Sequence, residues 1–167
     1  LLKKHKNFKF VKVDLNNFKE LRKLFDKYKV NKVIHLAAQP GVRVSIKNPY
    51  NTLKQNLIPF MNILEISRIK KIRKFIYASS SSVYGLTETY PFSENDYKNV
   101  PSSVYGATKL SNEIIAQSYS KNFRNIFSPM FDFSVHIVRG FHCSTFEQAC
   151  DAKSLLRLQQ IVACTTN

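Results

Sequence analysis

Glycine is scarce in this chain, with four residues among 167, and tryptophan is absent. The glycines stand far apart, so no segment forms the glycine-rich turn that wraps a phosphate group. No run of about eighteen apolar residues occurs, and no membrane span is expected. The opening segment, LLKKHKNFKF, has no apolar h-region and no cleavage signature, so no secretory signal peptide is expected either. It also lacks an initiating methionine, and we expect a fragment of a longer protein.

Cysteine is nearly as rare, and all three copies lie in the last quarter of the chain. This distribution is typical of reduced thiols, so a cytoplasmic location is expected. Cys143 and Cys150 lie near His136 and His142, but the spacing of these four residues matches no zinc pattern. No metal site is therefore expected.

Acidic residues are outnumbered, 11 against 26 Lys and Arg, which gives a net charge of +15. Such a charge is one signature of a nucleic-acid partner. The lysines are scattered, however, and no stripe of interleaved aromatic and basic residues is present. This pattern favours lysines spread over solvated helix faces, and no nucleic-acid partner is expected.

Strand-like and helical segments alternate three times before residue 125. Apolar–polar alternation predicts one strand, and two short apolar runs predict strands buried on both faces of a sheet; these strands lie at 8–15, 32–38 and 73–80. Helical spacing of apolar residues predicts three helices, at 16–29, 48–70 and 103–123. Asn16 or Asn17 can cap the first, and Pro59 should bend the second. Loops are predicted at 39–45 and 87–103.

This alternation indicates an α/β fold with a doubly wound parallel sheet. In such sheets, ligands bind beyond the carboxyl ends of the strands. We therefore expect the loop at 37–45, the four serines at 79–82 and Tyr105 to gather at one edge of the sheet.

The last forty residues differ in character. After residue 125 the only basic residues are Arg139, Lys153 and Arg157, and all the cysteines are here. No strand or helix period is clear until 153–162. We divide the chain into a domain at 1–124 and an atypical tail at 125–167.

Tyr105 and Lys109 are four residues apart, so a helix places them on one face. A phenol is a poor base at neutral pH, but a nearby ammonium lowers its pKa. A serine hydroxyl from the run at 79–82 can hold a substrate oxygen against the tyrosine. Together these groups can move a proton on or off a carbinol oxygen. A surface pair on a helix explains the spacing equally well if it is taken alone.

Five segments carry a family resemblance: VIHLAAQPGVRVSIKNPY, QNLIPFMNILEISR, KFIYASSSSVYG, YPFSEND and PSSVYGATKLSNE. They resemble segments of the extended short-chain dehydrogenase/reductases, within the nucleotide-sugar epimerases and dehydratases, and most of all those of the UDP-glucuronate 4-epimerases. The resemblance covers about residues 8 to 122, and it implies a Rossmann-like domain that binds NAD.

The resemblance implies a catalytic group of Ser80, Tyr105 and Lys109. Tyr105 would take the proton from the sugar 4-hydroxyl while the C4 hydride passes to NAD, and the 4-keto sugar would rotate and receive the hydride on its other face. Ser80 would bond the reacting oxygen, and Lys109 would hold the nicotinamide ribose. Apart from Tyr105 and Lys109, the cofactor positions implied are Asp14, Leu15, Leu36, Ala37, Ala38 and Asn56; ordinary strand ends and polar helix positions are the alternative for these.

Two details favour epimerisation of a uronate. Related 4,6-dehydratases carry an Asp-Glu pair after the catalytic hydroxyl residue, whereas this chain has Ser81 and Ser82, which have no useful acid or base. The segment QPGVRVS resembles the uronate-specific loop, and the planar fork of Arg43 suits a carboxylate. We expect substrate contacts from Arg43, Ser80 and Ser81, although a surface arginine is an equal alternative.

The resemblance also has gaps. Members of the family open with a glycine-rich strand–turn–helix, so we expect a partial Rossmann-like doubly wound parallel sheet that lacks its first β-α-β unit and the C-terminal substrate domain. The family has a further strand soon after the catalytic helix, but the segment at this place in the chain, MFDFSVHIVRGF, does not match the sequence of that strand. A reading-frame shift near 125–132 would explain the tail.

Three functions remain open on the sequence. The first is a nucleotide-sugar epimerase, a homodimer when complete, of which this fragment is itself inactive. The second is a non-catalytic remnant or pseudogene product, and the third is a basic nucleic-acid binder.

Overall fold

The computed structural model describes residues 8–87, 92–93, 100–124, 134–138 and 163–165 of the chain. Helices and strands alternate as the sequence predicted, and the fold class is α/β. In chain order the elements are α1 (Phe18–Lys27), β1 (Lys32–His35), α2 (Val42–Lys47), α3 (Pro49–Ile69), β2 (Lys74–Ala78), the 3₁₀ helix η2 (Ser81–Tyr84), α4 (Val104–Arg124), β3 (Ser134–Val138) and β4 (Ala163–Thr165).

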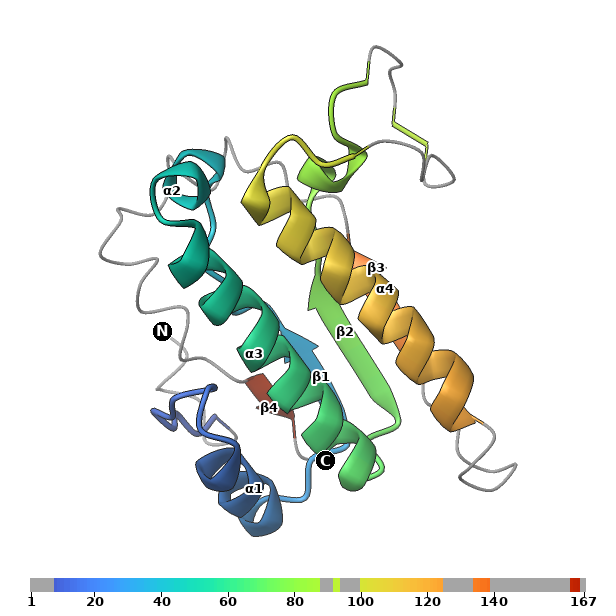
Figure 1. Cartoon of the computed structure of the whole chain (residues 1–167). Helices are drawn as coiled ribbons and strands as arrows, with labels where there is room; N and C mark the ends of the chain where they lie inside the picture. Colours follow the sequence, from blue (N-terminus) through green and yellow to red (C-terminus); the bar gives the residue numbers. More distant parts are fainter. Residues whose placement is uncertain (1–7, 88–91, 94–99, 125–133, 139–162, 166–167) are drawn as a thin grey trace.

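The four described strands form one sheet in the order β3-β2-β1-β4 (Figure 1). β1 pairs with β2 and β2 with β3 in parallel, so helices must return the chain between them. The sequence showed no clear strand period around 134–138, yet this segment pairs with β2 over five residues, because β2 offers it an open edge. β4 pairs antiparallel with the other edge, along β1.

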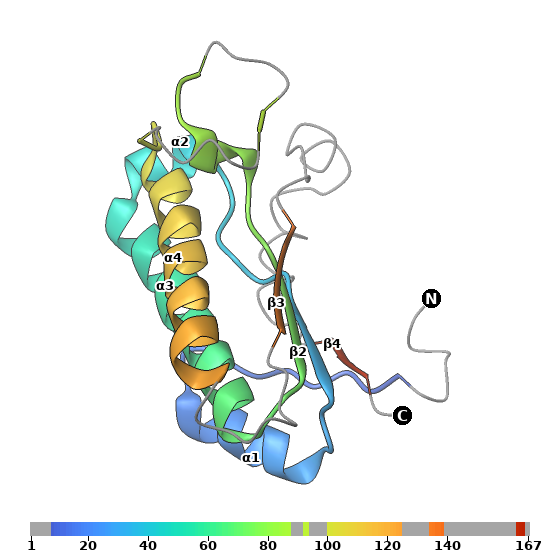
Figure 2. The ribbon, with the colours of Figure 1, turned by 90° about the vertical axis from the view of Figure 1, so that its right-hand side faces the viewer.

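Helices α1, α3 and α4 all lie on one side of the sheet (Figure 2). Val33 of β1 and Phe75 of β2 point to these helices and are buried. On the other face, Ile34 is exposed and Leu36, just beyond β1, is 56% exposed. The prediction of strands buried on both faces is therefore wrong for β1, because the described part of the chain places no helix on that second face.

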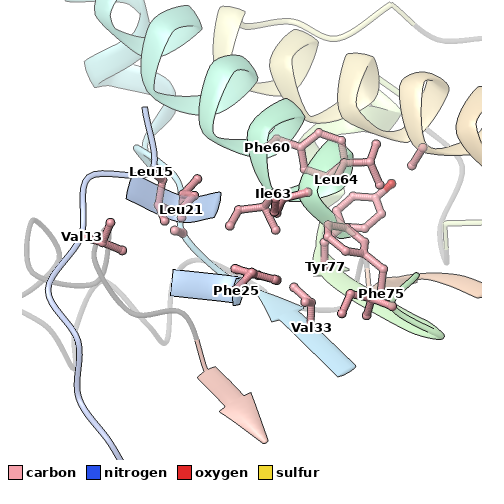
Figure 3. Packing of buried hydrophobic residues seen from close by; sticks show 14 residues of the cluster. Val13, Leu15, Leu21, Phe25, Val33, Phe60, Ile63, Leu64, Phe75 and Tyr77 are labelled. Atoms are coloured by element: carbon pink, nitrogen blue, oxygen red, sulfur yellow. The ribbon is translucent and has the colours of Figure 1, made fainter. Parts of the chain in front are cut away.

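An aromatic cluster fills the space between the sheet and α3 (Figure 3). The ring of Phe60 lies 5.0 Å from that of Tyr77 and 5.9 Å from that of Phe75, centroid to centroid. Leu21 and Phe25 of α1 extend the same core. Burial of one such side chain stabilises the fold by about 2–3 kcal/mol, so this cluster fixes where α3 sits on the sheet.

The strand predicted at 8–15 does not form. Residues 8–14 form neither a helix nor a strand, and no described strand pairs with them. The expected alternation is nevertheless present, since Val13 and Leu15 are buried while Asp14 is exposed. Asn62 of α3 holds the end of this segment by donating from Nδ2 to the Leu15 carbonyl at 2.8 Å.

Local capping explains the helix starts. Asn17 caps α1 by accepting from the Glu20 amide, and Asn48 caps α3 by accepting from the Asn51 amide, each at 3.2 Å. The predicted loop at 39–45 is wrong in its second half, where α2 begins after Gly41. Gly41 has φ 106°, a left-handed backbone that a glycine adopts without strain.

None of the helices that the structure describes is both long and apolar enough to cross a membrane.

Candidate active site

The four consecutive serines begin one residue after β2 and serve different purposes. Ser79 donates its hydroxyl to Glu113 of α4 at 2.5 Å. Ser80 is buried and caps η2, with its Oγ accepting from the Ser82 amide at 3.2 Å. Ser81 is half-buried at the start of η2. The four serines therefore form the connection between the end of β2 and the 3₁₀ turn η2, which packs against α4.

The start of α4 packs directly on this turn because residue 106 is glycine. A Cβ at Gly106 would lie 2.6 Å from the Ser82 carbonyl oxygen and 3.0 Å from the Pro101 Cβ. Sequence reasoning missed this residue as a part of the site. Its signal was a glycine inside a helix, where glycine is otherwise unfavourable.

Tyr105 and Lys109 lie side by side on α4 and are both buried. The Lys109 Nζ lies 5.9 Å from the centroid of the Tyr105 ring and donates to the Ala78 carbonyl at 3.0 Å. Ala78 is two residues before Ser80, and Gly106 next to Tyr105 touches Ser82. The structure thus brings the three predicted catalytic residues to one end of β2.

Burial sets the charges in this region. It lowers the pKa of Lys109 to about 8, so the ammonium still predominates at neutral pH. Burial, and then the charge of Lys109, lowers the pKa of His35 to about 3, so the imidazole is neutral. Lys109 is 5% exposed, which places its positive charge where water screens it little.

A pocket of about 230 Å³ opens at the carboxyl end of β1. It brings together four of the predicted cofactor residues from two segments, Asp14 with Leu15 and Ala37 with Ala38. Sequence reasoning missed the rest of the lining, which is Asn16, Gln55 and Pro59. Gln55 opens the segment QNLIPFMNILEISR and Asn16 was a candidate helix cap, but only the fold shows that both face this pocket.

Asn56 follows the pocket residue Gln55 on α3 and joins two parts of the site. Its Oδ1 accepts from the Gln39 amide at 2.6 Å, and its Nδ2 donates to the Gln39 carbonyl at 3.1 Å. Nδ2 also donates to the Thr108 hydroxyl at 3.1 Å, and Thr108 donates to the Tyr105 carbonyl at 2.7 Å. Asn56 therefore connects the loop after β1 to the helix that carries Tyr105.

The other predicted residues lie further out. Leu36 points away from the helices and is exposed, and Arg43 is exposed on α2. Within the described ranges, no three His, Cys, Asp or Glu side chains are grouped as metal ligands.

A parallel sheet, with a buried Tyr–Lys pair on one helix and a serine turn at the end of the neighbouring strand, defines a class. It is that of the extended short-chain dehydrogenase/reductases, among the nucleotide-sugar epimerases and dehydratases. The model of the GDP-mannose 4,6 dehydratase family matches residues 1–133, and the chain belongs to that family.

Known proteins agree with this class. Protein CapI of Staphylococcus aureus is 51% identical over 114 residues, which are 68% of this chain and 34% of CapI. A UDP-glucuronate 4-epimerase of Thermodesulfobacterium geofontis is 39% identical over 118 residues, 71% of this chain and 36% of the relative. The structure of a Thermus thermophilus UDP-glucose 4-epimerase in complex with NAD aligns with a TM-score of 0.66 at 28% identity, and covers 71% of this chain and 39% of that one. The chain thus spans about a third of the length of these curated relatives, 34% and 36%.

Proposed function

We propose that this chain supplies the catalytic helix and part of the cofactor site of an NAD-dependent UDP-sugar 4-epimerase, which converts UDP-glucuronate to UDP-galacturonate. The observation that carries the proposal is the buried Lys109 ammonium, next to Tyr105 and bonded to the Ala78 carbonyl at 3.0 Å. A relative that is 39% identical is a UDP-glucuronate 4-epimerase, which supports the substrate.

The pocket beside β1 fits part of a dinucleotide. Its volume of about 230 Å³ is below the roughly 300–1,000 Å³ typical of a whole ligand site, so it suits one nucleoside. Asp14 and Leu15 would hold the adenosine end, while the small side chains of Ala37 and Ala38 let the backbone approach it. When bound, NAD supplies an acceptor for the hydride of sugar C4 and returns that hydride later.

The residues of the chain handle the proton. Tyr105 accepts the proton of the sugar 4-hydroxyl and gives it back, because its phenolic oxygen is the group suited to exchange it. The Lys109 ammonium stabilises the phenolate, since an opposite charge nearby favours the ionised form. Ser80 hydrogen-bonds the reacting sugar oxygen and holds it in place.

Epimerisation rather than elimination follows from the two residues after Ser80. Ser81 and Ser82 have hydroxyl groups that neither donate nor accept a proton readily at neutral pH, so the water loss of a dehydratase has no acid or base here. Arg43 on α2 would pair with the carboxylate of the uronate, for which its planar fork is suited.

The complete protein is proposed to be a cytoplasmic homodimer. Ile46, Tyr50 and Leu53 on α2 and α3 are large apolar side chains that are exposed in the single chain, which supports a covering partner. We propose no nucleic-acid partner, because Lys19, Arg22 and Lys23 lie on the exposed face of α1, as on any solvated helix.

A segment exchange tests the proposed activity. In the Thermodesulfobacterium UDP-glucuronate 4-epimerase, the matching 118-residue segment is replaced by that of this chain, and turnover of UDP-glucuronate is followed by chromatography. We expect turnover in the chimera, and a loss of about 10²–10⁴-fold with Tyr105→Phe while NAD stays bound.

Tyr119→Phe is the matched control on the same helix, because its hydroxyl donates to Glu65 at 3.2 Å, away from the site. This variant should keep the rate of the chimera. A chimera that binds NAD without turnover, or unchanged turnover with Tyr105→Phe, would contradict the proposal.

A further inference from the structure

A buried carboxylate lies one helical turn beyond Lys109. Glu113 is 0% exposed, and its Oε1 accepts a hydrogen bond from the Ser79 hydroxyl at 2.5 Å, across 34 positions of sequence. Removing a carboxylate from water costs several kcal/mol, and an apolar residue of similar size in such a place is often neutral or stabilising. Stability alone therefore gives no reason for a glutamate at this position.

The contacts of α4 with the end of β2 give such a reason. Successive turns of α4 touch this segment at three points: Gly106 packs on the Ser82 carbonyl, Lys109 donates to the Ala78 carbonyl, and Glu113 accepts from Ser79. Ser80 lies between these points. Of these three contacts, only the Ser79–Glu113 hydrogen bond joins two side chains; the other two contacts involve a backbone carbonyl.

The direction of the Ala78 carbonyl depends on the residue that follows it. Ala78 and Ser79 share one peptide unit, which is planar, so a rotation at Ser79 turns the Ala78 carbonyl as well. If Ser79 loses its anchor, that carbonyl is free to turn away from the Lys109 ammonium. The same rotation would displace the Ser80 hydroxyl.

We propose that Glu113 is a positioning residue: through its hydrogen bond with Ser79, it fixes the end of β2 so that the Ala78 carbonyl meets Lys109 and Ser80 keeps its place. Its importance for catalysis rests on the proposed function, but the geometric statement does not. Glu113 touches neither substrate nor cofactor in this role, and it acts through Ser79.

The pH titration midpoint of Lys109 tests whether its ammonium still meets the Ala78 carbonyl, and its measurement does not require an active enzyme. In the full 167-residue chain labelled with ¹³C-lysine, the ε-carbon signal of Lys109 is followed against pH and assigned by its loss in Lys109→Arg. Ser79→Ala should lower the midpoint by about one pH unit, because a hydrogen bond to a charged group that is lost from a buried site corresponds to a shift of this size.

Two further variants separate a hydrogen bond from other causes. Glu113→Gln keeps an oxygen that accepts from Ser79, and the midpoint should stay near that of the wild type. Ser67→Ala is the matched control, since it removes another buried serine hydroxyl, which donates to the Ile63 carbonyl at 2.6 Å on α3. It should leave the midpoint of Lys109 unchanged.

A folded Ser79→Ala chain with the wild-type midpoint would overturn the proposal. An equal fall in Ser67→Ala would also overturn it, because general loosening would then be the cause. If the midpoint of Lys109 falls in Glu113→Gln but not in Ser79→Ala, the charge of Glu113 and not its hydrogen bond with Ser79 is the cause, and the proposal is wrong. Failure of the epimerase assay, in contrast, would refute the proposed function and leave this titration as it stands.

Discussion

Replacing Gly106 by alanine has two opposite effects of similar size on the stability of the chain: a gain in helix propensity and a steric clash. Alanine at a helical position is favoured over glycine by about 1 kcal/mol, so propensity alone predicts a more stable protein. The new Cβ, however, would lie 2.6 Å from the Ser82 carbonyl oxygen. These atoms must separate by roughly 0.8 Å or more before they reach ordinary contact, which begins at 3.4 Å.

The clash should exceed the gain from propensity. Its nearest atom belongs to the backbone of η2, which cannot rotate away as a long side chain would, and the Pro101 Cβ closes the other side at 3.0 Å. Overpacking of this kind costs about 1–3 kcal/mol. We expect a net loss of up to about 2 kcal/mol, or up to roughly 8 °C in Tm for a chain of this size.

Thermal and urea unfolding of the full chain, followed by circular dichroism, measures the balance. Ala107→Gly, at the exposed neighbouring position, measures the propensity term without a clash and should cost about 1 kcal/mol. If Gly106→Ala stabilises the chain by as much as Ala107→Gly destabilises it, then η2 gives way freely. The packing of α4 on the serine turn would in that case be loose, and the expected clash at Gly106 would be refuted.

Three further predictions concern pH, substrate and cofactor. In the folded chain the pKa of His35 is lowered from the ordinary value of 6.5 to about 3. Between these two pH values the imidazole is protonated in the unfolded chain but neutral in the folded chain. Stability should therefore fall by a few kcal/mol on acidification through this window, and less in His35→Phe, as urea midpoints would show. In the chimera, Arg43→Leu should raise KM for the uronate more than for the neutral hexose, and equal effects would leave Arg43 a surface residue. The 167-residue chain itself should bind NAD weakly, since its sequence has no segment with the glycine spacing of a phosphate-binding loop. Micromolar binding at one site per chain in calorimetry would contradict this.

Features that depend on neighbours in the sequence were predicted well. The helices α1, α3 and α4 follow from apolar spacing, and the cap of α1 from Asn17. The placement of Tyr105 beside Lys109 follows from a spacing of four, which is a local property of any helix. Short apolar runs likewise gave β1 and β2, although each is shorter than predicted.

Features that depend on distant partners were not predictable. The segment before Asp14 has the pattern of a strand, but a strand also needs a neighbour to bond with. The contact of Gly106 with Ser82 and the bond of Ser79 to Glu113 join residues that only the packing of α4 on the sheet brings together. The two segments at Asp14 and Ala37, which the sequence predicted to hold the cofactor, meet in one pocket for the same reason.

The pairing of the sheet has a consequence for how the chain folds. Its central strands, β1 and β2, pair residues 42 apart, such as Lys32 and Lys74, whereas Lys74 pairs with Ser134, 60 residues further on, and Lys32 pairs with Thr165, 133 residues further on. During synthesis the inner pair is complete long before either outer strand has been made. Within these 167 residues, β3 and β4 are the described strands that cover the two edges of this pair, and an edge that is still uncovered recruits other chains. Contacts of such long sequence separation also form slowly, so growth temperature and synthesis rate should affect the soluble yield more than the small size of the chain implies.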